Sequence, residues 1–198
     1  MIEILTGLGL AMSAGLSAYI PLLALGLLGR YTGIVELPAQ WAWLGNGWVL
    51  LVLGVLLVLE VFADKIPALD HINDLIQTLI RPVAGGVAFT AGSSSLTTGN
   101  TDPGQVFSEG ALLPFLIGLT LALAVHVAKA TLRSVVNLST AGVGAPVVST
   151  VEDISAVSMT IIAILLPVLV LVFLVSAAVM GLWMMRRRHA RALRAADA

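Results

Sequence analysis

The sequence predicts an all-α integral membrane protein with about four transmembrane helices, one or two short re-entrant or broken helical segments and an interfacial amphipathic helix. Composition predicts this class before any motif does. Hydrophobic residues make up 59% of the 198-residue chain, whereas soluble domains contain about 45–50%. Charged residues make up 11%, against about 25% in soluble domains. Lipid must therefore cover much of the surface.

The charges are unevenly spread, and this predicts an orientation. The net charge is -1, yet half of the ten Lys and Arg residues lie in residues 186–198. A basic segment after an apolar run is typical of the cytoplasmic side. We therefore expect residues 1–185 to form a single membrane domain and residues 186–198 a basic cytoplasmic tail. With no cysteine in the chain, thiolate metal sites and disulfides are excluded, and neither a cofactor nor nucleic acid is expected.

The first predicted span is the uncharged stretch Ile4–Gly29, which is long enough to cross a hydrocarbon core of about 30 Å. No basic residue precedes this apolar run, so it does not resemble a cleaved signal peptide. Gly7, Ala11 and Gly15 are spaced i, i+4, i+8, a stripe that favours close helix packing. Pro21 predicts a kink or break in the same stretch.

Tryptophans 41, 43 and 48 then indicate a membrane interface, and a second span is expected from Trp48 to about Glu60–Lys65. Pro67 begins a new element. Apolar and polar residues alternate with helical period over Ala68–Ile80, which predicts an amphipathic helix lying in the interface.

Two later segments are apolar but too short or too rich in small residues to span comfortably. They are Val83–Gly92 and Ala141–Val151. We expect one or both of them to enter the bilayer and return to the same side without crossing it. The third span is predicted over residues 111–129. The last is Ile154–Met185, which carries no charge and is the clearest span in the chain.

The order of parts suggests an internal repeat. Each predicted unit has a span that ends in charged residues, then a polar piece, then a run of small residues. If both small segments re-enter, the units have opposite orientations, which is typical of transporters. The alternative is chance, because glycine and alanine runs recur in apolar chains.

Two charged stripes are the candidate site. Glu60 and Asp64 share one helix face, and His126, Lys129 and Arg133 form a second stripe on the third span. Their charges are complementary, so the stripes could face each other and bind an anion or relay protons. The alternative is that each side chain reaches out to interfacial water. Ionisable residues in spans favour function, but these lie near the span ends.

The substrate site would lie where broken segments meet these stripes, because unwound backbone and helix ends supply partial charges. Ser17, Gly142 and Gly144 are the candidates in those segments. The cluster Asp70–Asp74 is interpreted as a solvated helix face rather than a metal site. The acids of Ser149–Asp153 are interpreted as a helix cap.

Three stretches carry a resemblance to a known family: Gly15–Leu23, Glu60–Asp74 and Ala141–Asp153. They resemble a family of small bacterial multi-pass integral-membrane proteins catalogued as a domain of unknown function. The resemblance covers nearly the whole chain except the basic tail, and implies a multi-pass membrane fold without an assigned activity. A looser similarity exists to lipid-carrier translocases, which also use Gly- and Pro-broken re-entrant helices.

The first functional hypothesis is a small transporter or translocase in the bacterial inner membrane, with an anionic solute or a lipid phosphate as substrate. A homodimer is expected at this size. The second hypothesis is an accessory subunit of a larger membrane complex, in which glycine stripes are packing seams and charges are anchors. A membrane enzyme is not expected, because no catalytic motif occurs in the sequence.

Overall fold

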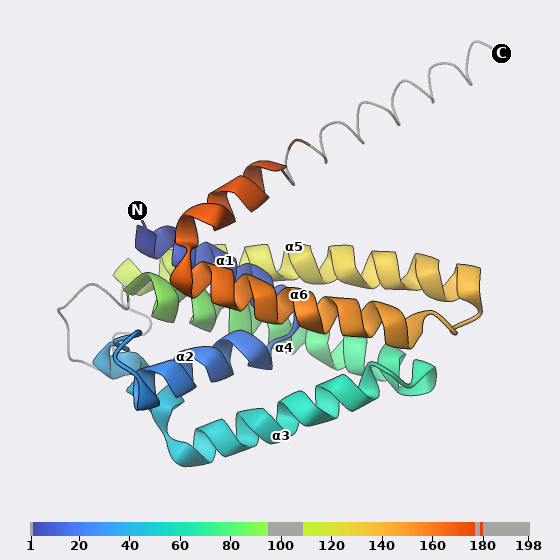
Figure 1. The fold of residues 1–198 in the computed structure, drawn as a ribbon, viewed down its shortest axis with the longest axis horizontal. Helices are drawn as coiled ribbons and strands as arrows, with labels where there is room; N and C mark the ends of the chain where they lie inside the picture. Colours follow the sequence, from blue (N-terminus) through green and yellow to red (C-terminus); the bar gives the residue numbers. More distant parts are fainter. Residues whose placement is uncertain (1, 95–108, 177–178, 180–198) are drawn as a thin grey trace, which may run out of the picture.

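The computed structural model describes residues 2–94, 109–176 and 179, and every regular element among them is helical, as expected. Figure 1 shows how these helices are arranged. The elements are α1 (Ile2–Leu16), α2 (Tyr19–Tyr31), the 3-10 helix η1 (Ala39–Gly45), α3 (Gly47–Ala63), α4 (Pro67–Ser94), α5 (Glu109–Thr140), α6 (Ala145–Leu165) and a short helix Pro167–Ser176.

The first predicted span is wrong as a single crossing, because the chain breaks at Ser17 and Ala18. Helix α2 then turns back toward the end of the bundle where α1 begins (Figure 1). Pro21 lies in the first turn of α2, where a missing backbone N–H is tolerated. A 15-residue α1 is only about 22 Å long, and α1 and α2 form a helical hairpin whose tip lies inside the bundle.

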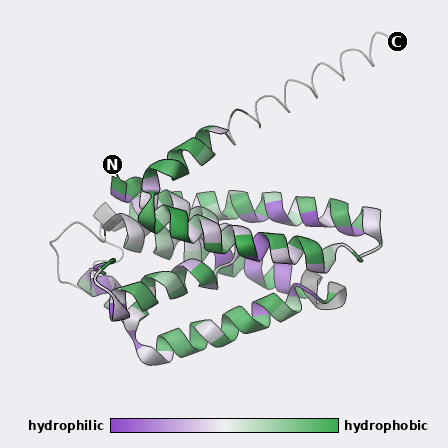
Figure 2. Ribbon diagram, viewed as in Figure 1, coloured by the Kyte–Doolittle hydropathy of each residue, from purple (hydrophilic) through white to green (hydrophobic). Residues whose placement is uncertain are grey.

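Two helices are long and apolar enough to cross a membrane: Leu112–Thr140 of α5 and Ala145–Leu165 of α6. The bent pair η1 and α3 makes a third if it is counted as one span. The count of about four is therefore not confirmed. Figure 2 colours most of α3, α5 and α6 as hydrophobic. Large apolar side chains such as Leu51, Phe62 and Ile154 are exposed, as expected where lipid is the solvent.

Helix α4 corrects two expectations at once. The predicted interfacial helix and the predicted re-entrant segment Val83–Gly92 are the two halves of one continuous helix. Pro82 lies inside it and removes a single backbone hydrogen bond. The small residues that follow pack instead of breaking the helix: Ala84 and Ala88 are buried, and Gly85 lies against Ala122 of α5.

The second predicted re-entrant segment is also wrong. Ala141–Gly144 is a tight turn with positive φ at Ala141 (51°) and Gly142 (83°), and α6 begins directly after it at Ala145. Consequently α3 and α5 run in the same direction, and α4 and α6 run back (Figure 1). The α3–α4 pair and the α5–α6 pair therefore have the same orientation, so the predicted inverted repeat is wrong.

The last predicted span is interrupted as well. Helix α6 ends at Leu165, and Pro167, which has no backbone N–H, follows Leu166. The helix Pro167–Ser176 leaves the bundle at an angle (Figure 1). The predicted basic tail, residues 186–198, lies outside the described residues.

Small residues hold α1 between α4, α5 and α6. A Cβ on Gly7 would come 2.8 Å from the backbone oxygen of Phe89 in α4, and one on Gly15 would come 2.6 Å from that of Ala122 in α5. Close approach of this kind needs glycine, which confirms the packing role expected for the stripe. It also fixes where the end of α1 lies inside the bundle.

Candidate functional site

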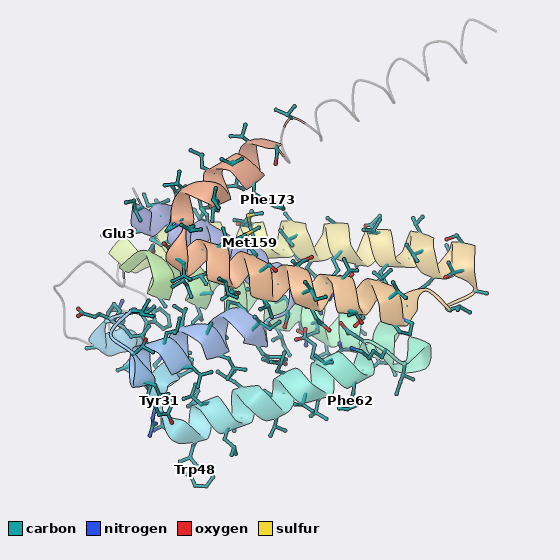
Figure 3. The ribbon with its side chains drawn as sticks, viewed as in Figure 1. Glu3, Tyr31, Trp48, Phe62, Met159 and Phe173 are labelled. Atoms are coloured by element: carbon teal, nitrogen blue, oxygen red, sulfur yellow. The ribbon has the colours of Figure 1, made fainter. Side chains whose placement is uncertain are left out.

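Polar and charged side chains gather beyond the tip of the α1–α2 hairpin, between the long helices (Figure 3). We call this cluster the ion-pair network. Its members come from α4, α5, α6 and the C-terminal end of α3: Glu60, Asp64, Asp74, Arg81, His126, Lys129, Arg133 and Glu152. Most are almost fully buried; Glu60 is 3% exposed, Arg81 0% and Arg133 1%.

Glu60 joins the hairpin tip to α4. Its Oε1 accepts a hydrogen bond from Nη2 of Arg81 at 2.9 Å, and its Oε2 accepts one from the Ser17 hydroxyl at 2.6 Å. Both carboxylate oxygens are therefore satisfied by donors. The hydroxyl of Ser17, at the break between α1 and α2, thus serves a buried charge.

Asp64 lies one helical turn further, at the C-terminal cap of α3. Its Oδ2 accepts from Nη2 of Arg133 at 3.2 Å and from Nζ of Lys129 at 3.4 Å. Its Oδ1 accepts from the amide of Asn73 at 2.6 Å, and Arg81 approaches Oδ2 to 3.9 Å. Three cations therefore converge on one carboxylate.

Lys129 connects α5 to the end of α1 and to α6. Its ammonium donates to the backbone oxygen of Leu16 at 2.8 Å. That carbonyl lies in the last turn of α1, where carbonyls lack helical partners and attract positive charge. The same ammonium lies 3.3 Å from Oε2 of Glu152, which also accepts a hydrogen bond from Arg133.

His126 is held as a neutral imidazole by its neighbours. Nη1 of Arg81 lies 2.9 Å from its Nδ1, and because a guanidinium can only donate, Nδ1 must be the acceptor. Nε2 then carries the proton and donates to the Thr78 hydroxyl at 3.0 Å. Thr78 in turn donates to the backbone oxygen of Asp74 at 2.7 Å.

Asp74 is the most weakly held acid of the network. Its Oδ1 lies 3.8 Å from Arg81 and 4.0 Å from Arg133, both beyond hydrogen-bonding distance. That oxygen is buried and has no hydrogen-bond partner. Its side chain is nevertheless 19% exposed, against 1% for Asp64, so Asp74 lies nearer to solvent.

The structure brings both predicted stripes and Ser17 into contact. The acids of α3 face the cations of α5, and burial at 5% exposure or less excludes the alternative that these charges reach out to water. Gly142 and Gly144 do not belong to the cluster. They form the turn after α5, where the N–H of Gly142 donates to Asn137 and that of Gly144 to Thr140.

Three members were not predicted: Asp74, Arg81 and Glu152. Glu152 was interpreted as a helix cap, which is wrong because α6 begins at Ala145 and places it in the helix interior. Asp74 was assigned to a solvated helix face, and Arg81 was not singled out as a site residue. Their seven-residue spacing on one helix face was the available signal, but it could be used only if α4 continued through Pro82.

The cluster Asp70–Asp74 was also weighed as a metal site. The side chains of Asp70 and His71 lie outside those that the structure describes. Among the described residues, no group of three or more His, Cys, Asp or Glu side chains is placed to hold a metal ion.

Comparison with known proteins identifies one family. The model of a domain of unknown function, DUF4126, matches residues 4–187. No curated protein and no solved structure was found to match the chain.

Proposed function

We propose a function from the geometry of the ion-pair network, because the chain belongs to the DUF4126 family, a domain of unknown function. The proposed function is that of a small membrane transporter, and the ion-pair network is its site. The single observation that carries this proposal is the burial of six charged side chains from four helices around the tip of the α1–α2 hairpin.

The energetic cost of the network supports a functional role. Taking an ion out of water costs several kcal/mol, and apolar replacements of buried ion pairs are often neutral or stabilising. Yet three of the five Lys and Arg residues outside residues 186–198 lie here. Ionisable residues at membrane depth commonly mark substrate or ion pathways. Stability alone would be served by apolar residues.

The position of the network supports transport in particular. Transporter sites combine broken helices, free backbone carbonyls and charged side chains near the middle of the membrane. Here the break after α1 offers the carbonyl of Leu16 to Lys129 and the hydroxyl of Ser17 to Glu60. A displacement of the hairpin tip would therefore change the partners of both side chains.

Shared partners make such a change inexpensive. Asp64 and Glu152 both contact Lys129 and Arg133. When one contact opens, each cation keeps a second carboxylate, so no charge is left alone in a medium of low dielectric constant. A network of this kind can shift between two arrangements without the full desolvation penalty.

An anionic substrate stays a prediction. Each cation of the network already faces a carboxylate, so an anionic solute or a lipid phosphate would have to displace one. The bacterial inner membrane, the cytoplasmic C-terminus and the homodimer are retained as part of this proposal on the sequence arguments given above.

The proposal is tested by recording currents from protein-containing liposomes adsorbed on a solid-supported membrane. The probes are concentration jumps of protons, Na⁺ and inorganic phosphate. We expect a transient current for at least one probe, its loss in Glu60→Gln, and its retention in Glu36→Gln, which changes an exposed loop residue. Because Glu60→Gln disturbs a buried pair, Ser17→Ala serves as a milder variant and should reduce the same current.

The transporter is excluded if folded wild-type protein gives no current with any of the three probes. Co-purification of a stoichiometric membrane partner would then support the accessory subunit instead. A current that survives in both Glu60→Gln and Ser17→Ala would overturn the assignment of the site.

A further inference from the structure

We infer that water binds between α5 and α6, on the side of the ion-pair network that faces the Ala141–Gly144 turn. This hydrated path is the entrance through which a small hydrophilic solute reaches the network. The inference rests on the proposed function, because it gives that site an access route. It is carried by buried polar atoms that lack hydrogen-bond partners, by their position between the network and the turn, and by the closed packing on the opposite side.

Three buried side-chain atoms between α5 and α6 have no hydrogen-bond partner. They are Oδ1 of Asn137, Oγ of Ser149 and Oε1 of Glu152. Leaving a buried polar group unpaired in a dry interior costs about 1–3 kcal/mol. An internal water that bonds two or more such groups removes this cost. Three unpaired atoms in one place therefore indicate hydration.

Ser149 has the least access to bulk solvent of the three, at 0% exposure, yet it does not bond its own helix. Thr150 and Ser155, on the exposed face of α6, each donate to the backbone oxygen four residues earlier. The corresponding bond would have satisfied Ser149 through the oxygen of Ala145. Its hydroxyl is unpartnered instead, on the buried face that it shares with Glu152. It is therefore available to a molecule inside the bundle.

The register of the two helices places these groups in line. Arg133 of α5 hydrogen-bonds Glu152 of α6, which fixes one level of the antiparallel pair. Asn137 lies one turn beyond Arg133, and Ser149 lies one turn before Glu152. Residues three or four apart share a helix face, so Asn137 and Ser149 form the next level toward the turn. Asn137 is only half-buried, and the path reaches the outside there.

The α4 side of the network offers further groups to the same water. Oδ1 of Asp74, Oε1 of Gln77 and Nε of Arg81 are also buried without a hydrogen-bond partner. Water that enters along α5 and α6 therefore meets polar atoms on the far side of the ion pairs as well. The unpartnered Nε1 of Trp41 is separate from this group, because it belongs to η1, which packs against α2 and α3.

The bundle is closed on the opposite side of the network. Ser13 of α1 is also 0% exposed, but its hydroxyl lies 2.8 Å from the backbone oxygen of Ala156 and 2.7 Å from the hydroxyl of Thr160. Gly15 is in direct backbone contact with α5 at Ala122. Polar atoms there are satisfied within the protein, and close packing leaves no room for water. The entrance is therefore on the side of the turn.

Water fits these groups better than a metal ion or a lipid chain does. Water can donate to the Asn137 and Glu152 oxygens, and can donate to or accept from the Ser149 hydroxyl. A metal ion would be repelled by Lys129 and Arg133, which both contact Glu152. A lipid chain would leave all three polar atoms unpaired. The path therefore takes water and small hydrophilic solutes.

Cysteine accessibility in the full-length protein, reconstituted in lipid vesicles, tests the inference. The chain has no cysteine, so each variant carries a single thiol. The probe is a positively charged, membrane-impermeant methanethiosulfonate. Ser149→Cys should react at least about tenfold faster than the matched variant Ser13→Cys, because a thiol in dry, apolar packing forms little of the reactive thiolate. The two serines have the same exposure, 0%, and undergo the same substitution.

A second pair of variants keeps the test valid if one of the first pair does not fold. Asn137→Cys should react as fast as Ser149→Cys. Ala156→Cys should react as slowly as Ser13→Cys, because Ala156 is also 0% exposed and lies on the same face of α6, two turns beyond Ser149. Thermal unfolding of each variant shows which of them are folded.

The side of entry is measured in vesicles that hold the protein in a biased orientation. Two exposed positions mark the two ends of the bundle: Val143→Cys in the turn after α5 and Gly33→Cys in the loop after α2 (Figure 1). Unequal labelled fractions of these two variants show the bias. We expect the labelled fraction of Ser149→Cys to equal that of Val143→Cys.

Fast labelling of Ser149→Cys or Asn137→Cys from the side of Val143→Cys, with slow labelling of the controls, supports the inference. Slow labelling of both path variants overturns it, as does labelling of Ser13→Cys and Ala156→Cys at the same rate. A labelled fraction that follows Gly33→Cys overturns the side of entry. The readout does not depend on flux: the expected labelling without any current rejects the transporter and leaves the hydrated path in place.

Discussion

The two halves of α4 contribute different kinds of contact: polar and charged contacts before Pro82, and close packing of small residues after it. Before Pro82, the helix buries Gln77 and Arg81 at 2% and 0% exposure and holds Asp74 beside them. After Pro82, it buries Ala84 and Ala88, and Gly85 approaches α5 closely. The first half therefore contributes charged side chains that several partners share. The second half contributes a backbone surface that packs against α5 in a single close arrangement.

The comparison teaches how a small protein positions a buried site. Small residues permit little freedom, because backbones in direct contact cannot slide without opening a void or creating a clash. That contact fixes α1, and with it the Leu16 carbonyl and the Ser17 hydroxyl that Lys129 and Glu60 use. Rigid packing at one end of the bundle can thus support exchangeable ion pairs toward the other.

The largest expected effect comes from breaking the polar half. Arg81→Gln leaves Glu60 charged and buried without its cation, and we expect the free energy of unfolding to fall by about 3–5 kcal/mol. Denaturation of the purified protein in detergent measures this. The double variant Glu60→Gln, Arg81→Gln removes both charges and should regain part of the loss. If the double variant is as unstable as the sum of the two single variants, the two side chains are not coupled.

Breaking the tightly packed half is expected to cost less. Gly15→Ala adds a Cβ that would lie 2.6 Å from the Ala122 oxygen, and overpacking of this kind costs about 1–3 kcal/mol. The matched control is Gly54→Ala in α3, where a Cβ meets nothing within 4 Å; it should stabilise the helix by about 0.8–1 kcal/mol. The same denaturation assay separates the two, and equal effects would contradict the packing described here.

The same contrast explains what the sequence could predict. Composition sufficed for the helical class, and helical spacing sufficed to align Glu60 with Asp64 and Lys129 with Arg133, because both depend on local periodicity. Whether the two stripes meet depends on tertiary packing, and their complementary charges were the only hint of that contact in the sequence. Local signals failed where a residue has two roles: Pro82 predicted a helix end, yet neighbouring helices hold α4 together around it.

The errors at Ile4–Gly29 and at Ala141–Val151 have a related cause. An apolar run shows that a segment can lie in lipid, but it does not show whether the chain crosses the membrane or turns back within it. A helical hairpin and a single crossing therefore look alike in sequence. The glycines near Gly142 predicted a re-entrant segment, but they serve a turn with positive φ, which is the other common use of glycine. Only the packing of the neighbouring helices distinguishes these uses.

A smaller change sharpens the comparison at the hairpin tip, where the rigid and exchangeable parts meet. Ser17→Ala removes one hydrogen bond to the charged Glu60, a contact worth about 1.5–3 kcal/mol. If the bond differs between the two arrangements of the network by about 1.4 kcal/mol, the transport current changes about tenfold. Ser134→Ala is the control, because that exposed hydroxyl donates to the backbone oxygen of Ala130 in its own helix. Equal currents in the two variants would remove Ser17 from the site.

The smallest effect is expected at the edge of the cluster. Lys65 and Asp153 lie 3.6 Å apart, with side chains that are 37% and 23% exposed. Water and salt screen such a pair, so its loss in Lys65→Gln should lower the free energy of unfolding by about 1 kcal/mol or less. The loss should diminish further at high salt. Measured beside Arg81→Gln, it compares two ion pairs that differ mainly in burial. If Lys65→Gln costs as much as Arg81→Gln, or abolishes the current, burial is not what distinguishes the site, and the boundary of the network has to be extended to include Asp153.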